Sequence, residues 1–216
     1  MKPNKKLRDV LLPAFNPCQY IDVCDASCRE AKWSPLDGHV PRGFLGATAR
    51  MIDVEVVMVM AEPGHPYSGQ SFVPDASPGT MLEAACLDTY RIRQAASGQF
   101  HRNMRWFLDE LYPGMTFDEQ LRYVWMTEGR LCSIENEIGN LVDHTCAQNY
   151  LGTQLALLSH ATVVAFGGKA KRYLRKLKVD FVGAYALAPP GANHKPAKPT
   201  WRNAIDAIKA KRVARE

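Results

Sequence analysis

Short runs of β-branched and apolar residues recur along the chain and predict strands. Four runs stand out: Val54–Ala61, Arg122–Thr127, Ala161–Gly167 and Asp180–Leu187. Each run has the length of a strand and is bounded by turn-forming or charged residues. Because the runs are almost continuously apolar, we expect the strands to be covered on both faces, as in a parallel sheet.

Segments with helical periodicity separate these runs. The predicted helices are Thr80–Ala96, His101–Leu111, Phe117–Leu121, Asp143–Leu158, Gly168–Leu177 and Thr200–Arg212, the last with Thr200 as its N-cap. The alternation predicts an α/β fold, a three-layer α/β/α sandwich with a central, mainly parallel four-stranded sheet. With 216 residues and no internal repeat, the chain is expected to form a single domain, residues 1–216.

The composition excludes two broad classes of protein. A hydrophobic content of 46% argues against a largely disordered chain. No run approaches the roughly 18 consecutive apolar residues that cross a bilayer. The apolar stretch after the basic N-terminus is interrupted at Pro13, so no secretory signal is expected. We therefore expect a cytoplasmic or nucleoid-associated protein, monomeric, with no membrane partner and no obligatory protein partner.

Positive charge is concentrated near the C-terminus. The net charge of +5 permits a nucleic-acid partner without requiring one. Residues 169–178 carry six positive charges and no negative charge, and residues 195–215 are also basic. These runs indicate either a solvated helix face or a surface for an anionic partner.

Two irregular loops follow predicted strands. In the first, Met60–Phe72, Glu62 comes directly after the strand and His65 lies three residues further on. These two residues are candidates for an acid/base pair, with a simple turn as the alternative. The second loop, Ala188–Pro199, is rich in proline and glycine. Because open α/β sheets carry their functional loops at the carboxyl ends of strands, both loops are expected to border one crevice.

The chain has six cysteines: Cys18, Cys24, Cys28, Cys86, Cys132 and Cys146. Without an export signal, disulfides are the less favoured use. Cys24 and Cys28 form a close pair in an expected N-terminal loop, and Cys132 and Cys146 flank the start of a helix. Two such pairs suit an iron–sulfur cluster or a zinc ion, with simple burial as the alternative. Cys18 and Cys86 are expected to lie outside such a site.

Together these segments resemble the uracil-DNA glycosylase superfamily, most closely its iron–sulfur branch, often called family four. The resemblance extends from about Cys24 to Pro190 and is clearest in the block 146–170. There a cysteine and a Tyr-Leu pair lead through a helix to a strand that ends in glycine and then a Lys-Ala helix start. A Pro-Gly loop followed by Gly69–Phe72 and a terminal proline-rich loop also occur in the family's order.

The resemblance implies a DNA glycosylase of base-excision repair, which hydrolyses the N-glycosidic bond of a flipped uracil or another deaminated base. Met60–Gly64 matches the catalytic motif, whose forms include GQDPY, GEAPG and GMNPG, and it places Glu62 at the catalytic position. Phe72 matches the aromatic residue that stacks on the base, and Gly64 and Glu128 complete the implied base-binding set. Cys24, Cys28, Cys132 and Cys146 match the ligands of a [4Fe–4S] cluster, with zinc as the alternative metal.

A glycosylase must take the base out of the stack and hold the flanking phosphates with positive charge or helix N-termini. The helix after the third strand and the proline-rich loop are the segments expected to do this. The residues expected to contact DNA are Lys169, Lys171, Arg172, Pro189, Pro190, Asn193, His194 and Lys195.

Three positions depart from the family's pattern. Glu128 stands where the family reads uracil with an asparagine, Ala188–Gly191 lacks the motif's histidine, and Met60 replaces the leading glycine. A carboxylate accepts hydrogen bonds but donates none, which favours a base that offers donors. His194 or His65 are candidates to replace the histidine. A non-catalytic DNA-binding member of the same fold is therefore an alternative, and an α/β domain with an unrelated hydrolase activity is a third.

Overall fold

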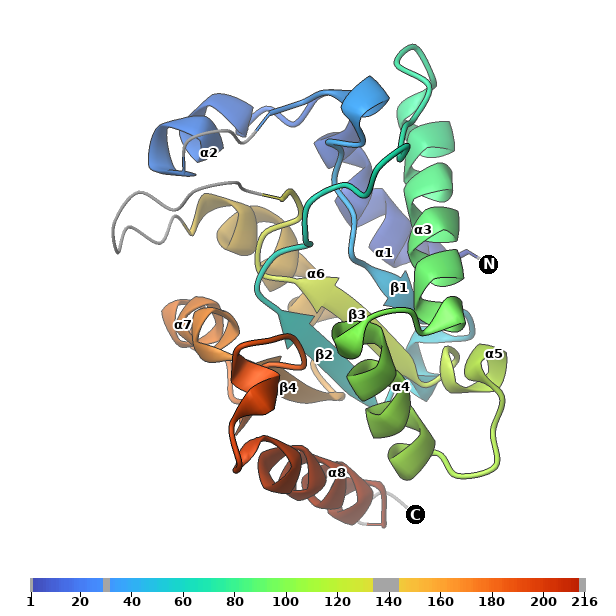
Figure 1. The fold of residues 1–216 in the computed structure, drawn as a ribbon, viewed down its shortest axis with the longest axis vertical. Coiled ribbons are helices and arrows are strands. Elements are labelled where there is room, and N and C mark those ends of the chain that lie inside the picture. Colours follow the sequence, from blue (N-terminus) through green and yellow to red (C-terminus); the bar gives the residue numbers. More distant parts are fainter. Residues whose placement is uncertain (1, 29–31, 134–143, 214–216) are drawn as a thin grey trace.

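The computed structural model describes residues 2–28, 32–133 and 144–213, without the side chains of residues 25–28, and it is an α/β fold (Figure 1). The α-helices are α1 (Lys5–Leu11), α2 (Ile21–Cys28), α3 (Pro78–Ala95), α4 (Gln99–Leu111), α5 (Phe117–Gln120), α6 (Gly152–Leu157), α7 (Gly168–Lys176) and α8 (Ala197–Val213). The strands are β1 (Leu45–Gly46), β2 (Val56–Met60), β3 (Val124–Glu128), β4 (Thr162–Phe166) and β5 (Val182–Ala184). Short helical turns are η1 (Leu12–Phe15), η2 (Pro35–Asp37), η3 (Met51–Asp53), the π-helical η4 (Ala147–Leu151) and η5 (Gly191–Asn193).

The sheet has five strands in the order β1-β3-β2-β4-β5. β2 runs parallel to β3 and β4, and β4 runs parallel to β5, whereas β1 pairs antiparallel with β3. The four predicted apolar runs therefore form the four parallel strands. The prediction of a four-stranded sheet was incomplete, because a strand of only two residues leaves no periodic pattern in the sequence.

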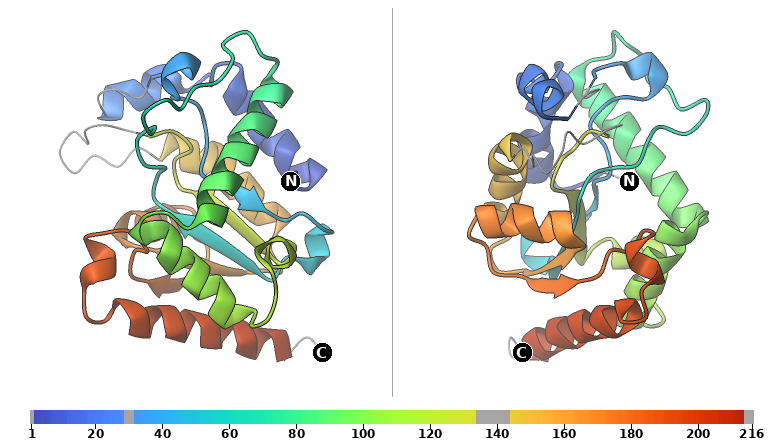
Figure 2. Two further views of the ribbon diagram at one scale, coloured as in Figure 1. Left: turned by 45° about the vertical axis from the view of Figure 1, so that its right-hand side comes forward. Right: turned by 60° about the vertical axis from the view of Figure 1, so that its left-hand side comes forward.

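Helices cover both faces of the sheet (Figure 2). On one face, Val57 of β2 and Trp125 of β3 lie in an apolar core with buried residues of α1, α3, α6 and α7. On the other face, Val56 and Met58 lie in a second core with α4 and α8. Successive residues of a strand point to opposite faces, so one strand contributes to both cores. Every residue of β2, β3 and β4 is accordingly buried.

The predicted helices are present, with differences at their ends. α8 begins at Ala197, so the assignment of Thr200 as its N-cap was wrong. The Thr200 hydroxyl oxygen instead accepts a hydrogen bond from the Tyr185 amide at 3.0 Å and donates to the Ala197 carbonyl at 2.8 Å. The predicted helix 143–158 is divided in the described residues into the π-helical turn η4 and the short helix α6.

Two N-terminal helices were not predicted. α1 contributes Leu7 and Leu11 to the core. α2 contains Cys24 and Cys28, so the expectation that this pair lies in a loop was wrong. A spacing of four residues puts the two positions one turn apart on a helix. Within residues 2–28, 32–133 and 144–213, no helix has the length and apolar content needed to cross a bilayer.

Candidate functional site

The carboxyl ends of the adjacent strands β2 and β3 bring two glutamates to one edge of the sheet. Met60, the last residue of β2, is in register with Glu128, the last residue of β3. The pairing continues past both strands, because the Gly129 amide donates to the Met60 carbonyl at 2.8 Å and the Arg130 amide donates to the Ala61 carbonyl at 3.0 Å. The backbone just before Glu62 is therefore fixed beside the end of β3.

Glu62 forms an ion pair with Lys169, the second residue of α7. The Lys169 Nζ lies 2.5 Å from Glu62 Oε1, and the two side chains are 29% and 18% exposed. The other carboxylate oxygen, Oε2, is buried and has no hydrogen-bond partner among the described residues. The sequence suggested Lys169 as a phosphate contact, whereas in the structure its ammonium group holds the candidate catalytic carboxylate.

Glu128 is 3% exposed and lies beside a buried arginine. Its Oε1 is 3.8 Å from the Arg93 guanidinium, which is too long for a hydrogen bond. Arg93 donates instead to the Gly43 carbonyl and to the Met126 sulfur. Burial raises the pKa of Glu128 well above its ordinary value and lowers the pKa of Arg93 to about 10.

Gly43 shows how closely the chain packs against Glu128. A Cβ at Gly43 would lie 2.7 Å from both Cγ and Oε1 of Glu128. Such a distance is shorter than atoms in a well-packed interior adopt, so this position excludes a side chain. Gly43 also has a φ of 88°, which favours glycine over other residues.

A second buried arginine, Arg42, fixes the loop after β2. Its guanidinium donates to the Gly38 carbonyl at 2.9 Å, to the Gly64 carbonyl, and to the Ser133 hydroxyl at 3.2 Å. Burial lowers the pKa of Arg42 from its ordinary value. Gly64, a predicted base-binding residue, is exposed, and its carbonyl is engaged by this arginine.

His65 and Phe72, also predicted for the site, lie in different surroundings. His65 is exposed and lines a polar pocket with His39, Tyr67 and Gln70, and Glu62 is not among the residues that line it. Phe72 is 7% exposed and belongs to the core on the α3 side of the sheet. The acid/base partnership of Glu62 with His65, and stacking of a base on Phe72, remain predictions.

The helix α7 and the loop after β5 meet at Tyr185. The Lys171 Nζ lies 6.0 Å from the centre of the Tyr185 ring, and the His194 ring lies 5.5 Å from it. The same loop is joined to α4, because Gln99 donates to the Asn193 side chain at 2.7 Å. The expectation that these two segments lie together is consistent with this arrangement.

The other residues predicted to contact DNA lie on the same segments. Pro189 and Pro190, joined by a cis peptide bond, are exposed, as are Arg172 and Lys195. These side chains therefore lie at the surface.

Four cysteines of the described residues line one small cavity. They are Cys18, Cys24, Cys132 and Cys146, and Tyr150 of the π-helical turn lines it with them. Cys18 was expected to lie outside the site, but its sulfur lies 3.3 Å from the Tyr150 hydroxyl at this cavity. The Leu131 amide donates to the Cys146 sulfur at 3.4 Å. The cavity thus gathers cysteines from the N-terminal segment and from the segment after β3.

The donor set fits a thiolate-binding metal, because cysteine thiolates are common ligands of zinc and of iron–sulfur clusters. Burial raises the pKa of Cys132 to about 12 and raises the pKa of Cys146 as well, and neighbouring thiols add to both effects. Within residues 2–28, 32–133 and 144–213, no group of three or more potential ligands has the arrangement of a metal site. The side chain of Cys28, the remaining predicted ligand, lies outside the described residues. Cys86 is buried in the core, as expected.

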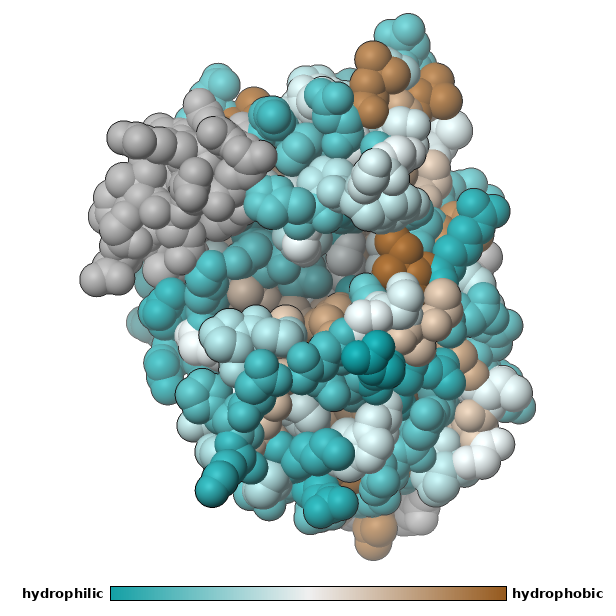
Figure 3. All heavy atoms as spheres, in the orientation of Figure 1, coloured by the Kyte–Doolittle hydropathy of each residue, from teal (hydrophilic) through white to brown (hydrophobic). Residues whose placement is uncertain are grey.

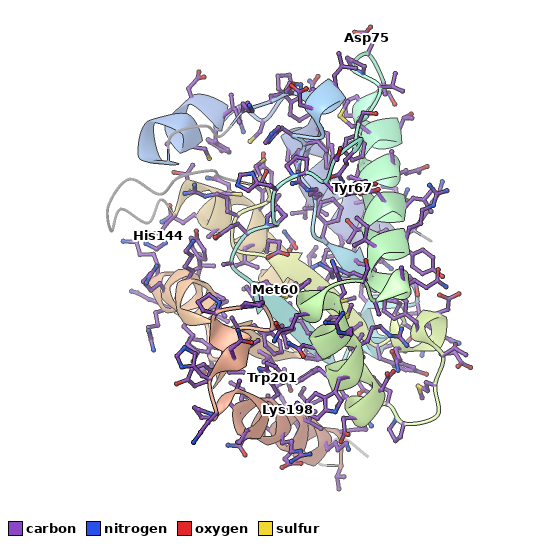
Figure 4. The ribbon with its side chains drawn as sticks, in the orientation of Figure 1. Met60, Tyr67, Asp75, His144, Lys198 and Trp201 are labelled. Carbon is purple, nitrogen blue, oxygen red and sulfur yellow. The ribbon has the colours of Figure 1, made fainter. Side chains whose placement is uncertain are left out.

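The surface is recessed where the strand ends meet it. Met60 lies near the middle of the face drawn in Figure 4. Figure 3, in the same orientation, shows a hollow in the molecular surface around that place. Met60 is the last residue of β2, so this strand ends near the recess.

Sequence reasoning did not identify Arg42, Arg93, Tyr185 or Cys18 as parts of the site. For Arg93 the sequence does contain a signal, because its helical spacing after Cys86 and Thr89 puts this charged residue on the buried face of α3. No protein-family model matches the chain, and no significantly similar curated protein is found.

Proposed function

We propose that this chain is a DNA glycosylase-like enzyme of the uracil-DNA glycosylase type, which hydrolyses the N-glycosidic bond of a flipped, damaged base. One observation carries the proposal: Glu62, at the position of the family's catalytic residue, is held by Lys169 at the carboxyl end of β2. The parallel order β3-β2-β4-β5, with helices on both faces, supports the sandwich expected for that superfamily.

In the proposed reaction, water replaces the base at the sugar C1′ carbon. The bond from C1′ to the base nitrogen breaks, and its electron pair leaves with the base. Positive charge develops on the sugar, and a fixed carboxylate nearby stabilises that charge. A water molecule held by the Glu62 carboxylate adds to C1′, and its proton is taken up by the carboxylate and then by the departing base. Lys169 holds the carboxylate through Oε1.

The positively charged surface of α7 and the loop after β5 are proposed to bind the DNA backbone. Lys171 and His194 lie against the same Tyr185 ring, so charges at the two segments act on one stretch of DNA. Contacts to phosphate make binding salt-dependent, because each neutralised phosphate releases counterions. Replacing Lys171 and Lys195 together by alanine is expected to weaken binding and flatten its salt dependence. An unchanged salt slope would place the DNA on another surface.

The cysteine cavity is proposed to hold a [4Fe–4S] cluster, with zinc as the alternative. Cys24, Cys132 and Cys146 are the expected ligands that line the cavity, and Cys28 or Cys18 completes the set. When bound, the cluster would join the N-terminal segment covalently to the segment after β3. This link would stabilise the fold, because a metal bound only by the native state adds its binding free energy to folding.

Anaerobic purification tests this cofactor. The protein is expected to contain iron and to absorb broadly in the visible region, and Cys132→Ser is expected to remove both signals. Comparing Cys28→Ser with Cys18→Ser identifies the fourth ligand, and Cys86→Ser, in the core away from the cavity, is the matched control. An iron-free and zinc-free protein would contradict the proposal.

The activity itself is tested by release of free base from oligonucleotides that carry uracil, hypoxanthine, xanthine or undamaged bases. We expect release of a deaminated base by the native chain and strong loss of release with Glu62→Gln, while DNA affinity changes little. Salt-dependent DNA binding without release of any base would favour the non-catalytic DNA-binding alternative. No DNA binding at low salt would favour the unrelated hydrolase.

A further inference from the structure

Glu128 combines deep burial with an absence of hydrogen bonds from the side chains and backbone that the structure describes. The residue is 3% exposed, and its Oε2 atom has no hydrogen-bond partner among the described residues. Among the described residues, the nearest cation is Arg93, 3.8 Å from Oε1. An ionised carboxylate in the interior is stabilised chiefly by donors that reach it, and no donor in the described chain does so.

Charged groups approach Glu128 from three directions. Arg93 on α3 and Arg42 in the segment before β1 favour the ionised form, whereas Glu62 after β2 opposes it. Neither arginine donates a hydrogen bond to the carboxyl group, because their guanidinium groups bond to the Gly43, Gly38 and Gly64 carbonyls. Loss of hydration is the largest influence on Glu128, and it favours the neutral acid.

We propose that Glu128 is a neutral carboxylic acid that reads the substrate base with one donor and one acceptor. The proposal rests on the function proposed above. A protonated carboxyl group presents an O–H and a C=O on the same side, as an amide presents N–H and C=O. Glu128 would therefore do the work of the asparagine that the related glycosylases place here. The departure at this position then changes the residue but keeps the hydrogen-bonding pattern.

The base edge that fits this pattern has an N–H next to a carbonyl oxygen. The N3–H and O4 of uracil form such an edge, and so do the N1–H and O6 of hypoxanthine. The register partner of Glu128 is Met60, which lies near the recess in the surface, so the backbone of Glu128 is one strand spacing from the strand end at that recess. An ionised Glu128 would offer two acceptors and would repel the carbonyl oxygen of such a base.

The protonation state is tested first, without reference to activity. Stability to urea is compared between the native chain and Glu128→Gln over a range of pH. Below the ordinary glutamate pKa, the acid is protonated in both the folded and unfolded states. In that range, pH does not change the difference in free energy of unfolding between the two proteins. As pH rises above that value, the unfolded state loses a proton that the folded state keeps, so the native chain loses stability relative to Glu128→Gln. Glu110→Gln, at an exposed site on α4, is the matched control.

Base reading is tested by release of uracil across the same pH range. The native chain is expected to lose activity at high pH as Glu128 ionises, and Glu128→Gln is expected to keep activity there. Glu128→Met, which removes both polar atoms, is expected to lose release at every pH.

If the stability difference between Glu128→Gln and the native chain shrinks or reverses as pH rises, the proposal that Glu128 is neutral in the folded protein is wrong. If the native chain and Glu128→Gln lose uracil release equally at high pH, the proposal that Glu128 reads the base is wrong. Absence of release from every protein, despite the expected stability gap, would instead refute the proposed enzyme and the reading role with it.

Discussion

The coupling between Arg93 and Glu128 gives the most discriminating prediction about the interior of the site. The perturbation is a double-mutant cycle of Arg93→Met, Glu128→Gln and the double variant. Methionine keeps much of the arginine's volume and removes its charge. If Glu128 were ionised, a separation of 3.8 Å and an effective dielectric constant of about 20 would give an attraction of about 4 kcal/mol.

A neutral Glu128 predicts a much smaller coupling. No hydrogen bond joins the two side chains at 3.8 Å, so the interaction should fall at or below about 0.5 kcal/mol, the lower end for neutral hydrogen bonds. Arg93→Met alone still costs about 1.5–3 kcal/mol, because the Gly43 carbonyl loses a charged donor. The cycle isolates the pair from this separate loss.

The assay is equilibrium urea unfolding of the four proteins near pH 7, repeated at higher pH. We expect weak coupling near pH 7 that strengthens as Glu128 ionises. The gap in free energy of unfolding between Glu128→Gln and the native chain should widen by up to about 1.4 kcal/mol per pH unit between the ordinary glutamate pKa and the pH at which Glu128 ionises in the folded protein, and it should then level off. A coupling free energy of about 3 kcal/mol or more between Arg93 and Glu128 near pH 7 is typical of a buried ion pair. That result would refute the claim that Glu128 is neutral.

The remaining predictions concern packing around the same strand ends. A Cβ at Gly129 would collide with the Tyr173 ring, so Gly129→Ala should lower the free energy of unfolding by about 1–3 kcal/mol, with Gly79→Ala, where nothing lies within 4 Å, as the control. Gln154 accepts a hydrogen bond from the buried Trp125 indole at 2.9 Å, so Gln154→Leu should cost about 1–3 kcal/mol in the same assay. If the urea midpoint of unfolding is unchanged for either variant, the side chains around that position do not pack as closely as the structure shows.

The strands could be predicted from the sequence because their apolar runs carry the signal of burial on both faces. Val56–Met60 is buried at every position, as its uninterrupted apolar character indicates. The place of Glu62 in the fold could be predicted for the same reason, since the first charged residue after such a strand lies at the carboxyl edge of the sheet. β1 could not be predicted, because it depends on pairing with β3 rather than on its own two residues.

The partners within the site could not be read from the sequence. Lys169 and Glu62 are 107 residues apart, and no local pattern signals their ion pair. Cys18 lies outside the close cysteine pair, and only the folding of the N-terminal segment toward η4 brings it to the cavity. Arg93 was detectable in principle as a charged residue on the buried face of α3, but its contact with Glu128 depends on tertiary packing.

The central claim is that Glu62 serves the cleavage of an N-glycosidic bond. The direct measurement is the rate of free uracil release from a labelled oligonucleotide by the native chain and by Glu62→Gln, with DNA affinity measured for both. We expect measurable release by the native chain, a decrease on the order of a hundredfold or more with Glu62→Gln, and nearly equal DNA affinity of the two proteins. Equal release by the two proteins would contradict the role of Glu62, and no release of uracil or of any other base in the panel by the native chain would contradict the proposed enzyme.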